Sequence, residues 1–276
     1  MSTLRVTSAT LLILLFIFVI GCKDNSTNSL DEIQIQNCGN ISNIEITPIE
    51  ALYWDIMNGV PRGDIPGGVP TINNPGGFYS HTENNISGQP LLGFQYPAGY
   101  TPRTDETPNS IGVNVFRNDG RAIWRRSQLA IFNQARARDV LAFEINTLLD
   151  FLGGRASNIQ VICSHEGQAP VGQLAPGFSA EFANRLIRFD GFSALITVGV
   201  TFTPTSITSV VIQKNAAPTN EHDAEIMNTF LPISYQLLFT GGGERDSDGD
   251  GVPDSRDQCP NTPAGTAVNS VGCPAG

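Results

Sequence analysis

The chain has 276 residues, and its 26 acidic and 16 basic side chains give a formal net charge of −10 at neutral pH. An acidic chain without a basic run argues against binding of nucleic acid and against electrostatic docking on anionic lipid, because both surfaces repel it. Hydrophobic residues make up 40% of the chain, which is sufficient for one sizeable core.

The first residues have the pattern of an export signal. Residues 1–21 contain one basic residue, Arg5, and an uninterrupted apolar run over residues 11–20. This run is too short to span a bilayer but fits the hydrophobic region of a secretory signal. It ends in Val19-Ile20-Gly21-Cys22, which resembles the lipobox of bacterial lipoproteins. The alternatives are an ordinary cleaved signal and an amino-terminal anchor helix.

The lipobox resemblance implies a location in the cell envelope. It implies cleavage before Cys22 and acylation of that cysteine, and several acyl chains anchor a protein firmly in a membrane. In similar lipoproteins an aspartate after the cysteine favours retention in the inner membrane, whereas this chain has Lys23 there. We therefore expect the outer membrane, on its periplasmic face or at the cell surface. Residues 22–32 are polar and predict a flexible tether.

Residues 33–240 are expected to form the central domain. Residues 33–46 alternate in part and favour one or two edge strands, and residues 50–57 favour a short helical turn. Residues 59–110 are rich in glycine, proline and asparagine, which predicts a long loop system. Its aromatic residues are expected either to pack on the core or to present a binding surface: Phe78, Tyr79, Phe94, Tyr96 and Tyr100.

The clearest predicted element is one long helix over about residues 127–152, with Ser127 as its cap and Gly153-Gly154 as its end. Before it, residues 111–116 and 121–124 predict strands joined by a turn at Asn118-Asp119-Gly120. Four basic residues near or on the helix are expected to form a solvated face, with an anion site as the alternative: Arg125, Arg126, Arg136 and Arg138.

Strands dominate the rest of the predicted domain. Residues 159–163, 193–202, 206–213 and 233–239 predict strands, residues 179–187 a strand or a short helix, and residues 221–230 a short helix. Helices and strands do not alternate regularly, so we expect an α+β fold with a largely antiparallel sheet. A small irregular module follows at residues 241–276.

That module contains evenly spaced acidic residues. Counting from Asp246, carboxylates fall at positions 1, 3, 5, 9 and 12, and Gly251 falls at position 6. This spacing matches an oxygen-ligand loop for calcium, in which the carbonyl of position 7 also binds the ion. The predicted ligands are Asp246, Asp248, Asp250, Val252, Asp254 and Asp257. The alternative is a solvated acidic linker.

The flanks of the loop exclude an EF-hand, because Gly241-Gly242-Gly243 before it and Pro260 and Pro263 after it cannot form the required helices. The segment resembles a thrombospondin type 3 repeat of the kind found in bacterial envelope proteins that carry an outer-membrane protein A-like domain. The family implies a disulfide between Cys259 and Cys273. This chain has Asn269 where the family has an aspartate and shows one repeat instead of several, so we expect a lower calcium affinity.

Cysteine usage is consistent with export. Of the five cysteines, Cys22 is assigned to lipid and two are paired by the family resemblance, which leaves Cys38 and Cys163. An even remainder in an exported chain suggests a second disulfide, which would tie the start of the domain to its middle. Free thiols are the alternative.

The sequence contains no catalytic motif. Its three histidines, His81, His165 and His222, lack metal-ligand spacing, and no nucleophile elbow or phosphate loop is present. The leading hypothesis is therefore a lipid-anchored envelope protein that acts in binding, adhesion or scaffolding, with a protein or a glycan as partner. One alternative is an envelope hydrolase whose histidines converge with a buried carboxylate. Another is a peptidoglycan-associated linker without its wall-binding domain.

Overall fold

The fold was obtained as a computed structural model. It describes residues 46–59, 70–81, 92–131, 135–168, 177–203 and 208–239. In the carboxyl-terminal module it describes residues 248, 252, 257–263, 266, 268–269 and 271–274. The predicted edge strands over residues 33–46 lie almost entirely outside these ranges. No helix in the described ranges is long and apolar enough to cross a bilayer.

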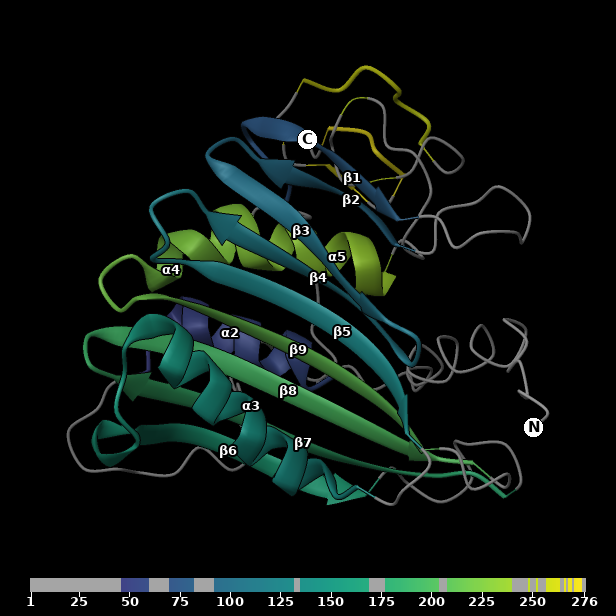
Figure 1. The fold of residues 1–276 in the computed structure, drawn as a ribbon. Helices are drawn as coiled ribbons and strands as arrows, with labels where there is room; N and C mark the ends of the chain where they lie inside the picture. The colour runs from purple at the N-terminus through teal and green to yellow at the C-terminus, as the bar shows by residue number, and fades with distance from the viewer. Residues whose placement is uncertain are drawn as a thin grey trace, which may run out of the picture.

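An antiparallel sheet of seven strands forms the centre of the molecule, in the order β3-β4-β5-β9-β8-β7-β6 (Figure 1). A second sheet pairs β1 with β2. The strands are β1 (Pro75–His81), β2 (Leu92–Pro97), β3 (Tyr100–Thr107), β4 (Ser110–Arg117), β5 (Ile123–Ile131), β6 (Gln160–Gln168), β7 (Ser179–Phe189), β8 (Phe192–Phe202) and β9 (Thr208–Pro218).

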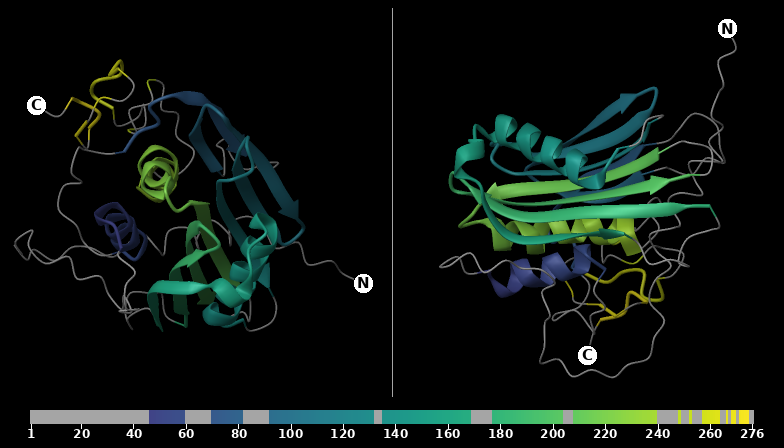
Figure 2. Two further views of the ribbon diagram at one scale, coloured as in Figure 1. Left: turned by 90° about the vertical axis from the view of Figure 1, so that its left-hand side faces the viewer. Right: turned by 90° about the horizontal axis from the view of Figure 1, so that it is seen from below.

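Helices cover both faces of the large sheet. Figure 2 shows α3 on one face and α2 with α5 on the other. The helices are α2 (Pro48–Met57), α3 (Ala137–Leu152), the short η1 (Ala156–Asn158), α4 (His222–Glu225), the π-helical η2 (Ile226–Phe230) and α5 (Leu231–Phe239). The predicted α+β class with a largely antiparallel sheet is confirmed.

The predicted long helix begins ten residues later than expected, at Ala137 instead of Ser127. Residues 127–131 belong to β5, where Ser127 stands opposite Gly112 of β4 and Ile212 of β9. Strand pairing on both sides occupies the backbone groups that a helix would need, so Ser127 caps nothing. The end was predicted correctly, because Gly153 takes the left-handed conformation with φ of 71°.

The cap of α3 comes from a distant strand. The carboxylate of Glu181 on β7 accepts a hydrogen bond of 2.6 Å from the backbone N–H of Ala137 and also binds Arg136. A negative group at a helix amino terminus is favourable because it meets unpaired N–H groups and the positive end of the helix dipole. A cap separated by 44 residues leaves no local signal in the sequence.

The predicted loop system over residues 59–110 is wrong in part, since it contains β1, β2 and β3. Its aromatic residues mostly pack on the core, as one of the two predicted roles required. Phe94 is fully buried, whereas Phe78 is 44% exposed. Tyr79, Tyr96 and Tyr100 pack against the core cluster that contains Phe94.

Residues 233–239 form helix α5, so the predicted last strand is wrong. Ile233 and Leu237 are one turn apart and both enter the core, which is a helical period. The helical stretch is continuous from His222 to Phe239. Its π-helical turn ends at Phe230, just before Pro232. The N–H that proline lacks therefore falls where the hydrogen-bond register changes.

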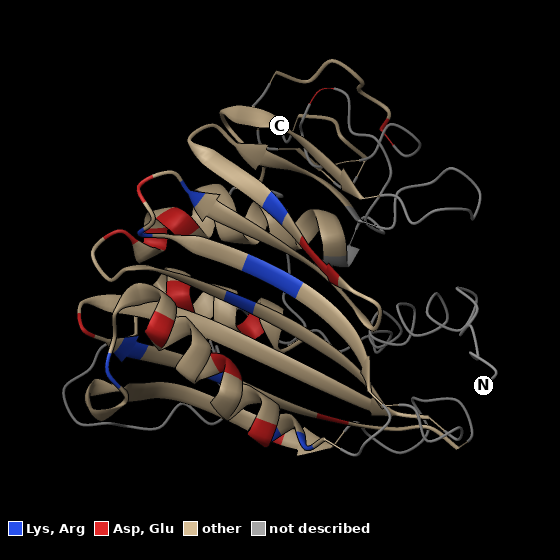
Figure 3. Cartoon of the chain, in the orientation of Figure 1, with Lys and Arg blue, Asp and Glu red and all other residues tan. Residues whose placement is uncertain are grey.

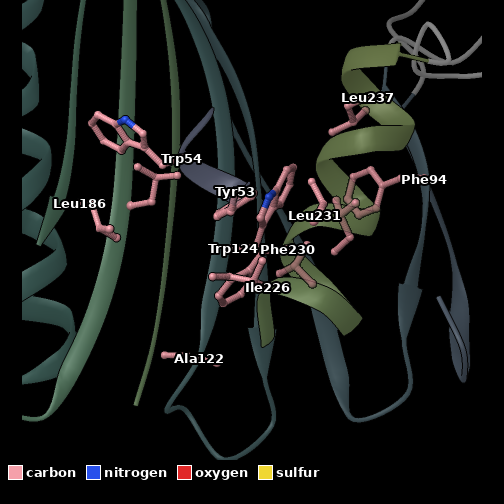
Figure 4. Close-up of a cluster of buried hydrophobic side chains, with 14 of the residues drawn as sticks. Tyr53, Trp54, Phe94, Ala122, Trp124, Leu186, Ile226, Phe230, Leu231 and Leu237 are labelled. Carbon is pink, nitrogen blue, oxygen red and sulfur yellow. The ribbon is translucent and has the colours of Figure 1, made fainter. Parts of the chain in front are cut away.

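Two hydrophobic cores result from this arrangement. One lies between the sheet and α3, and the other lies between the sheet and the helices α2 and α5. Figure 4 shows Trp124 and Phe94 in the second core, with ring centroids 5.5 Å apart. At its centre the hydroxyl of Ser234 accepts hydrogen bonds from Trp124 Nε1 at 3.1 Å and Gln213 Nε2 at 2.7 Å, and donates to the carbonyl of Phe230.

We predict that Ser234→Ala lowers the free energy of unfolding by about 2 kcal/mol, because two buried donors lose their acceptor. Urea denaturation followed by tryptophan fluorescence measures this change. Ser157→Ala, at an exposed position of η1, is the matched control and should alter stability by less than about 0.5 kcal/mol. Equal effects of the two substitutions would contradict the role of Ser234.

Candidate functional site

The described positions of the carboxyl-terminal module include three of the six predicted calcium ligands. Asp248 Oδ2 accepts a hydrogen bond of 2.7 Å from the backbone N–H of Thr262. Asp257 Oδ1 accepts one of 2.7 Å from the N–H of Cys259. Both carboxylates are therefore tied to the short segment 259–262, and Val252 is buried. Asp246, Asp250 and Asp254 lie outside the described residues.

A disulfide between Cys259 and Cys273, with Cα atoms 5.0 Å apart, closes this module. The buried hydroxyl of Thr262 lies 2.9 Å from the carbonyls of Cys259 and Gly272 inside the closed loop. The side-chain oxygen of Asn269 accepts hydrogen bonds from the N–H groups of Val271 and Cys273. The side-chain oxygen of Asn269 therefore holds a turn.

The predicted calcium loop lies only partly within the described residues. Among the described residues no three histidine, cysteine, aspartate or glutamate side chains converge as a metal site would require. Half of the six predicted ligands lie outside the described residues. Carboxylate and carbonyl oxygens are the donors that calcium prefers.

Cys163 is the third described cysteine. It lies on β6, is fully buried and forms a disulfide. Its partner lies outside the described residues, where Cys22 and Cys38 are the two remaining cysteines. The free-thiol alternative therefore does not hold for Cys163. Pairing with Cys38 and acylation of Cys22 stay predictions.

The structure does not bring the three histidines together. His81 on β1 lies 3.7 Å from Glu106, and His165 on β6 makes a 2.8 Å hydrogen bond with Asn58 beside the ring of Phe182. Burial lowers the pKa of His165. His222, at the start of α4, is the only one of the three histidines that contacts a buried carboxylate. The convergence that the hydrolase alternative requires is absent from the part of the chain that the structure describes.

The buried carboxylate beside His222 is Glu50, which is only 3% exposed. Its Oε1 lies 2.9 Å from His222 Nδ1, and its Oε2 accepts a bond of 2.9 Å from Arg188 on β7. Glu50 also completes the capping box of α2 with Thr47. One side chain therefore joins α2, the sheet and α4. The Thr47 and Glu50 spacing was the only sequence signal for this residue.

Burial by itself raises the pKa of Glu50, because it disfavours the charged carboxylate. The hydrogen bond and charge of His222, the N–H of Thr47 and the charge of Arg188 act in the opposite direction and prevail. The pKa of Glu50 therefore lies below its usual value, and the group is a carboxylate at neutral pH. His222 Nε2 is buried and has no hydrogen-bond partner among the described residues.

Two acidic residues at the start and in the first turn of α4, Glu221 and Glu225, are held by the sheet. Arg117 at the end of β4 binds Glu221 at 2.6 Å and Glu225 at 2.7 Å, and Asp119 binds the same guanidinium. The hydrogen bond to Asp119 is the largest of the effects that raise the pKa of Arg117. These contacts tie the acidic start of α4 to the end of β4.

A surface cleft of about 520 Å³ lies at the turn between β7 and β8. Arg188, Phe192 and Thr219 line it, together with η1. Asp190 at the turn has a φ of 44° and accepts a hydrogen bond of 2.9 Å from the N–H of Arg155. Polar residues make up most of the lining, and the lining residue Arg188 is bonded to Glu50, which does not itself line the cleft.

No protein-family model matches the chain, and no curated protein sequence matches it significantly. Among solved structures, a point mutant of the protein Mog1 aligns with 53% of this chain and 85% of its own, at 16% identity and a TM-score of 0.28. The Saccharomyces cerevisiae Ran-binding protein Mog1p aligns over the same shares at 15% identity and a TM-score of 0.27. Similarity this low carries no argument about fold or function.

We predict that Glu50→Gln lowers the free energy of unfolding by about 3 kcal/mol at neutral pH, because the half-buried Arg188 and the buried His222 lose their carboxylate. A depressed folded-state pKa contributes stability above the unfolded value of 4.5, and this contribution is lost as the pH falls through the folded value. The difference from the wild type should therefore shrink below about pH 4.

Urea denaturation between pH 3 and pH 7 measures that difference, with Glu166→Gln as the matched control. Glu166 pairs with Arg185 on the surface, so its substitution should cost less than about 1 kcal/mol. A difference for Glu50→Gln that stays constant down to pH 3 would contradict the assigned ionisation.

We also predict that peptide mapping of the mature protein without reductant finds Cys38 linked to Cys163. The measurement is mass spectrometry before and after reduction. The internal reference is the Cys259–Cys273 peptide, whose pairing the structure contains. A Cys22–Cys163 link would overturn this prediction and would also remove Cys22 as the acylated residue.

Proposed function

We propose that the protein is a lipid-anchored component of the bacterial outer membrane that binds or scaffolds other envelope molecules, with a calcium-stabilised module at its carboxyl end. The lipobox at Cys22 supports the anchor, and the acidic spacing from Asp246 to Asp257 supports the ion. The central domain supplies a rigid body between them. The buried Cys163 disulfide supports an oxidising compartment outside the cytoplasm.

The observation that carries the proposal is the arrangement of Asp248 and Asp257. They are nine residues apart, yet both bind backbone N–H groups within residues 259–262. The disulfide and the buried Thr262 fix that segment, so Asp248 and Asp257 both lie against it. A calcium loop requires this return of the chain, whereas an extended acidic linker does not.

Energetics assign different roles to the disulfide and the ion. A disulfide that closes a loop of this size contributes on the order of 3 kcal/mol. A single extracellular-type loop binds calcium with a dissociation constant near 0.1 to 1 mM, so millimolar calcium adds only about 1 kcal/mol. The covalent bridge therefore shapes the module, and calcium removes the repulsion among its carboxylates.

A binding or scaffolding role also agrees with how the central domain uses its charges. Glu50, Glu144 and Glu181 are buried, and each is bonded to a cation from another element. Such interlocked pairs fix the relative position of helices and sheet. Because these carboxylates are paired inside the domain, we expect a binding partner to contact the surface of the domain instead.

We predict that Asp248→Asn weakens calcium binding by about tenfold, since it removes one ligand charge while an amide oxygen still accepts the N–H of Thr262. Isothermal titration of the full mature protein at constant ionic strength measures this. Asp139→Asn, at an exposed position of α3, is the matched control and should titrate like the wild type. Heat equal to buffer dilution for the wild type at millimolar calcium would refute the calcium module.

A further inference from the structure

Two consecutive arginines of β5 point to opposite faces of the large sheet. Arg125 and Arg126 form the blue band on β5 in Figure 3. Neighbouring side chains on a strand alternate between its faces. Arg126 therefore shares a face with Trp124, which belongs to the core beneath α2 and α5, and we call this the inner face. Arg125 points to the other face, where it binds Asp105 at 2.8 Å.

Arg126 has no counter-charge among the residues that the structure describes. Its guanidinium makes no ion pair with them, and its hydrogen bond to Oε1 of Gln213 is long, at 3.4 Å. Burial lowers the pKa of Arg126 to about 10, so the group keeps its proton at neutral pH. A desolvated cation without a partner is costly, because nothing replaces the water that it has lost. An anion that reaches this guanidinium is therefore bound favourably.

A second donor without a partner lies two residues further along β5, on the same inner face. The amide nitrogen Nε2 of Gln128 is buried and has no hydrogen-bond partner in the described ranges. A buried donor that bonds to nothing carries the full cost of its lost hydration. The two positions are about 7 Å apart along the strand, within reach of one ligand. Both groups are satisfied by the same kind of partner, an acceptor with negative charge.

The inner face passes from dry core to half-exposed surface at Arg126. On one side of it, Trp124 is fully buried under the helices. Directly opposite Arg126 on β9, Gln213 contacts the end of α2, with Nε2 3.6 Å from Sδ of Met57. On the other side, a row of residues in register with Gln128 is only partly buried: Val211 of β9, Gly199 of β8 and Phe182 of β7. A buried charge and an apolar strip thus lie next to one another.

We propose that this part of the inner face binds a small organic monocarboxylate with an apolar body, whose carboxylate pairs with Arg126. The guanidinium fork matches a planar carboxylate, and Nε2 of Gln128 supplies a further donor. The strip of Val211, Gly199 and Phe182 supplies an apolar contact for the body of the ligand. This inference goes beyond the proposed envelope role and depends neither on the lipid anchor nor on calcium.

Charge and strand order select this occupant. One guanidinium balances one negative charge, whereas a phosphate group carries up to two. A polyanion would be repelled by a chain of net charge −10, and a neutral ligand would leave Arg126 without a counter-charge. The strands β5, β9, β8 and β7 are each paired on both sides, so a peptide finds no strand edge there to extend.

Titration calorimetry of the full mature protein with three probes tests the site. Octanoate should bind, because it combines one carboxylate with an apolar chain. Octanamide has the same chain without the charge and should bind at least about tenfold more weakly, through the loss of a charged hydrogen bond. Octyl phosphate should also bind more weakly than octanoate, because one guanidinium does not balance its second charge.

Arg126→Met removes the charge and keeps most of the side-chain volume. It should weaken octanoate binding at least about tenfold. The melting temperature should stay the same or rise, because an apolar group replaces a cation that has no partner in the fold. Arg138→Met, at an exposed position of α3, is the matched control and should change neither the affinity nor the melting temperature.

Gln128→Leu tests the second donor at constant charge. It should weaken octanoate binding several-fold without lowering the melting temperature, because the amide nitrogen that it removes has no partner in the described part of the fold.

Four results would overturn the inference. The first two are the absence of octanoate binding at millimolar concentration and equal affinities for octanoate and octanamide. The third is octyl phosphate binding as tightly as octanoate, which would identify a phosphate site. The fourth is a lower melting temperature of Arg126→Met with octanoate affinity unchanged, which would place the counter-charge of Arg126 within the protein itself. Calcium titration of the same sample is a separate readout, so failure of the calcium module leaves this test intact.

Discussion

The pairing of β5 with β9 is the constraint on which the rest of the structure depends. It joins two groups of strands that are separate in sequence, β3 to β5 on one side and β6 to β9 on the other. Its register decides both faces at once, because a shift of one residue would exchange the faces of every side chain. It places Trp124 opposite Asn215 over the core and Arg125 opposite Lys214 on the other face.

Charge has two separate uses in this acidic protein. Inside the protein, single carboxylates such as Glu50 and Glu181 connect elements that are distant in sequence. Each holds its elements together because a buried charge that loses its partner strongly destabilises the fold. In the carboxyl-terminal module five acidic residues are concentrated within residues 246–257, where the proposed calcium ion would offset their repulsion.

Sequence reasoning succeeded where the signal was local. The strand pairs joined by Asn118-Asp119-Gly120, the helix over residues 50–57 and the stop at Gly153 all follow from turn and cap chemistry within a few residues. It failed at residues 127–131 and 233–239, whose apolar patterns fit a helix and a strand equally well. Strand partners on both sides decided the first segment, and packing of Ile233 and Leu237 against the core decided the second.

The sequence by itself determined the export pattern, the spacing of the acidic loop, the α+β class and the antiparallel sheet, because each depends on neighbouring residues or on composition. Only the tertiary structure decided that Glu50 meets His222 and Arg188, that Glu181 caps α3, and that Phe116 of β4 packs against Phe151 of α3. These contacts join positions separated by many residues. Their existence depends on strand order and register, which no local pattern specifies.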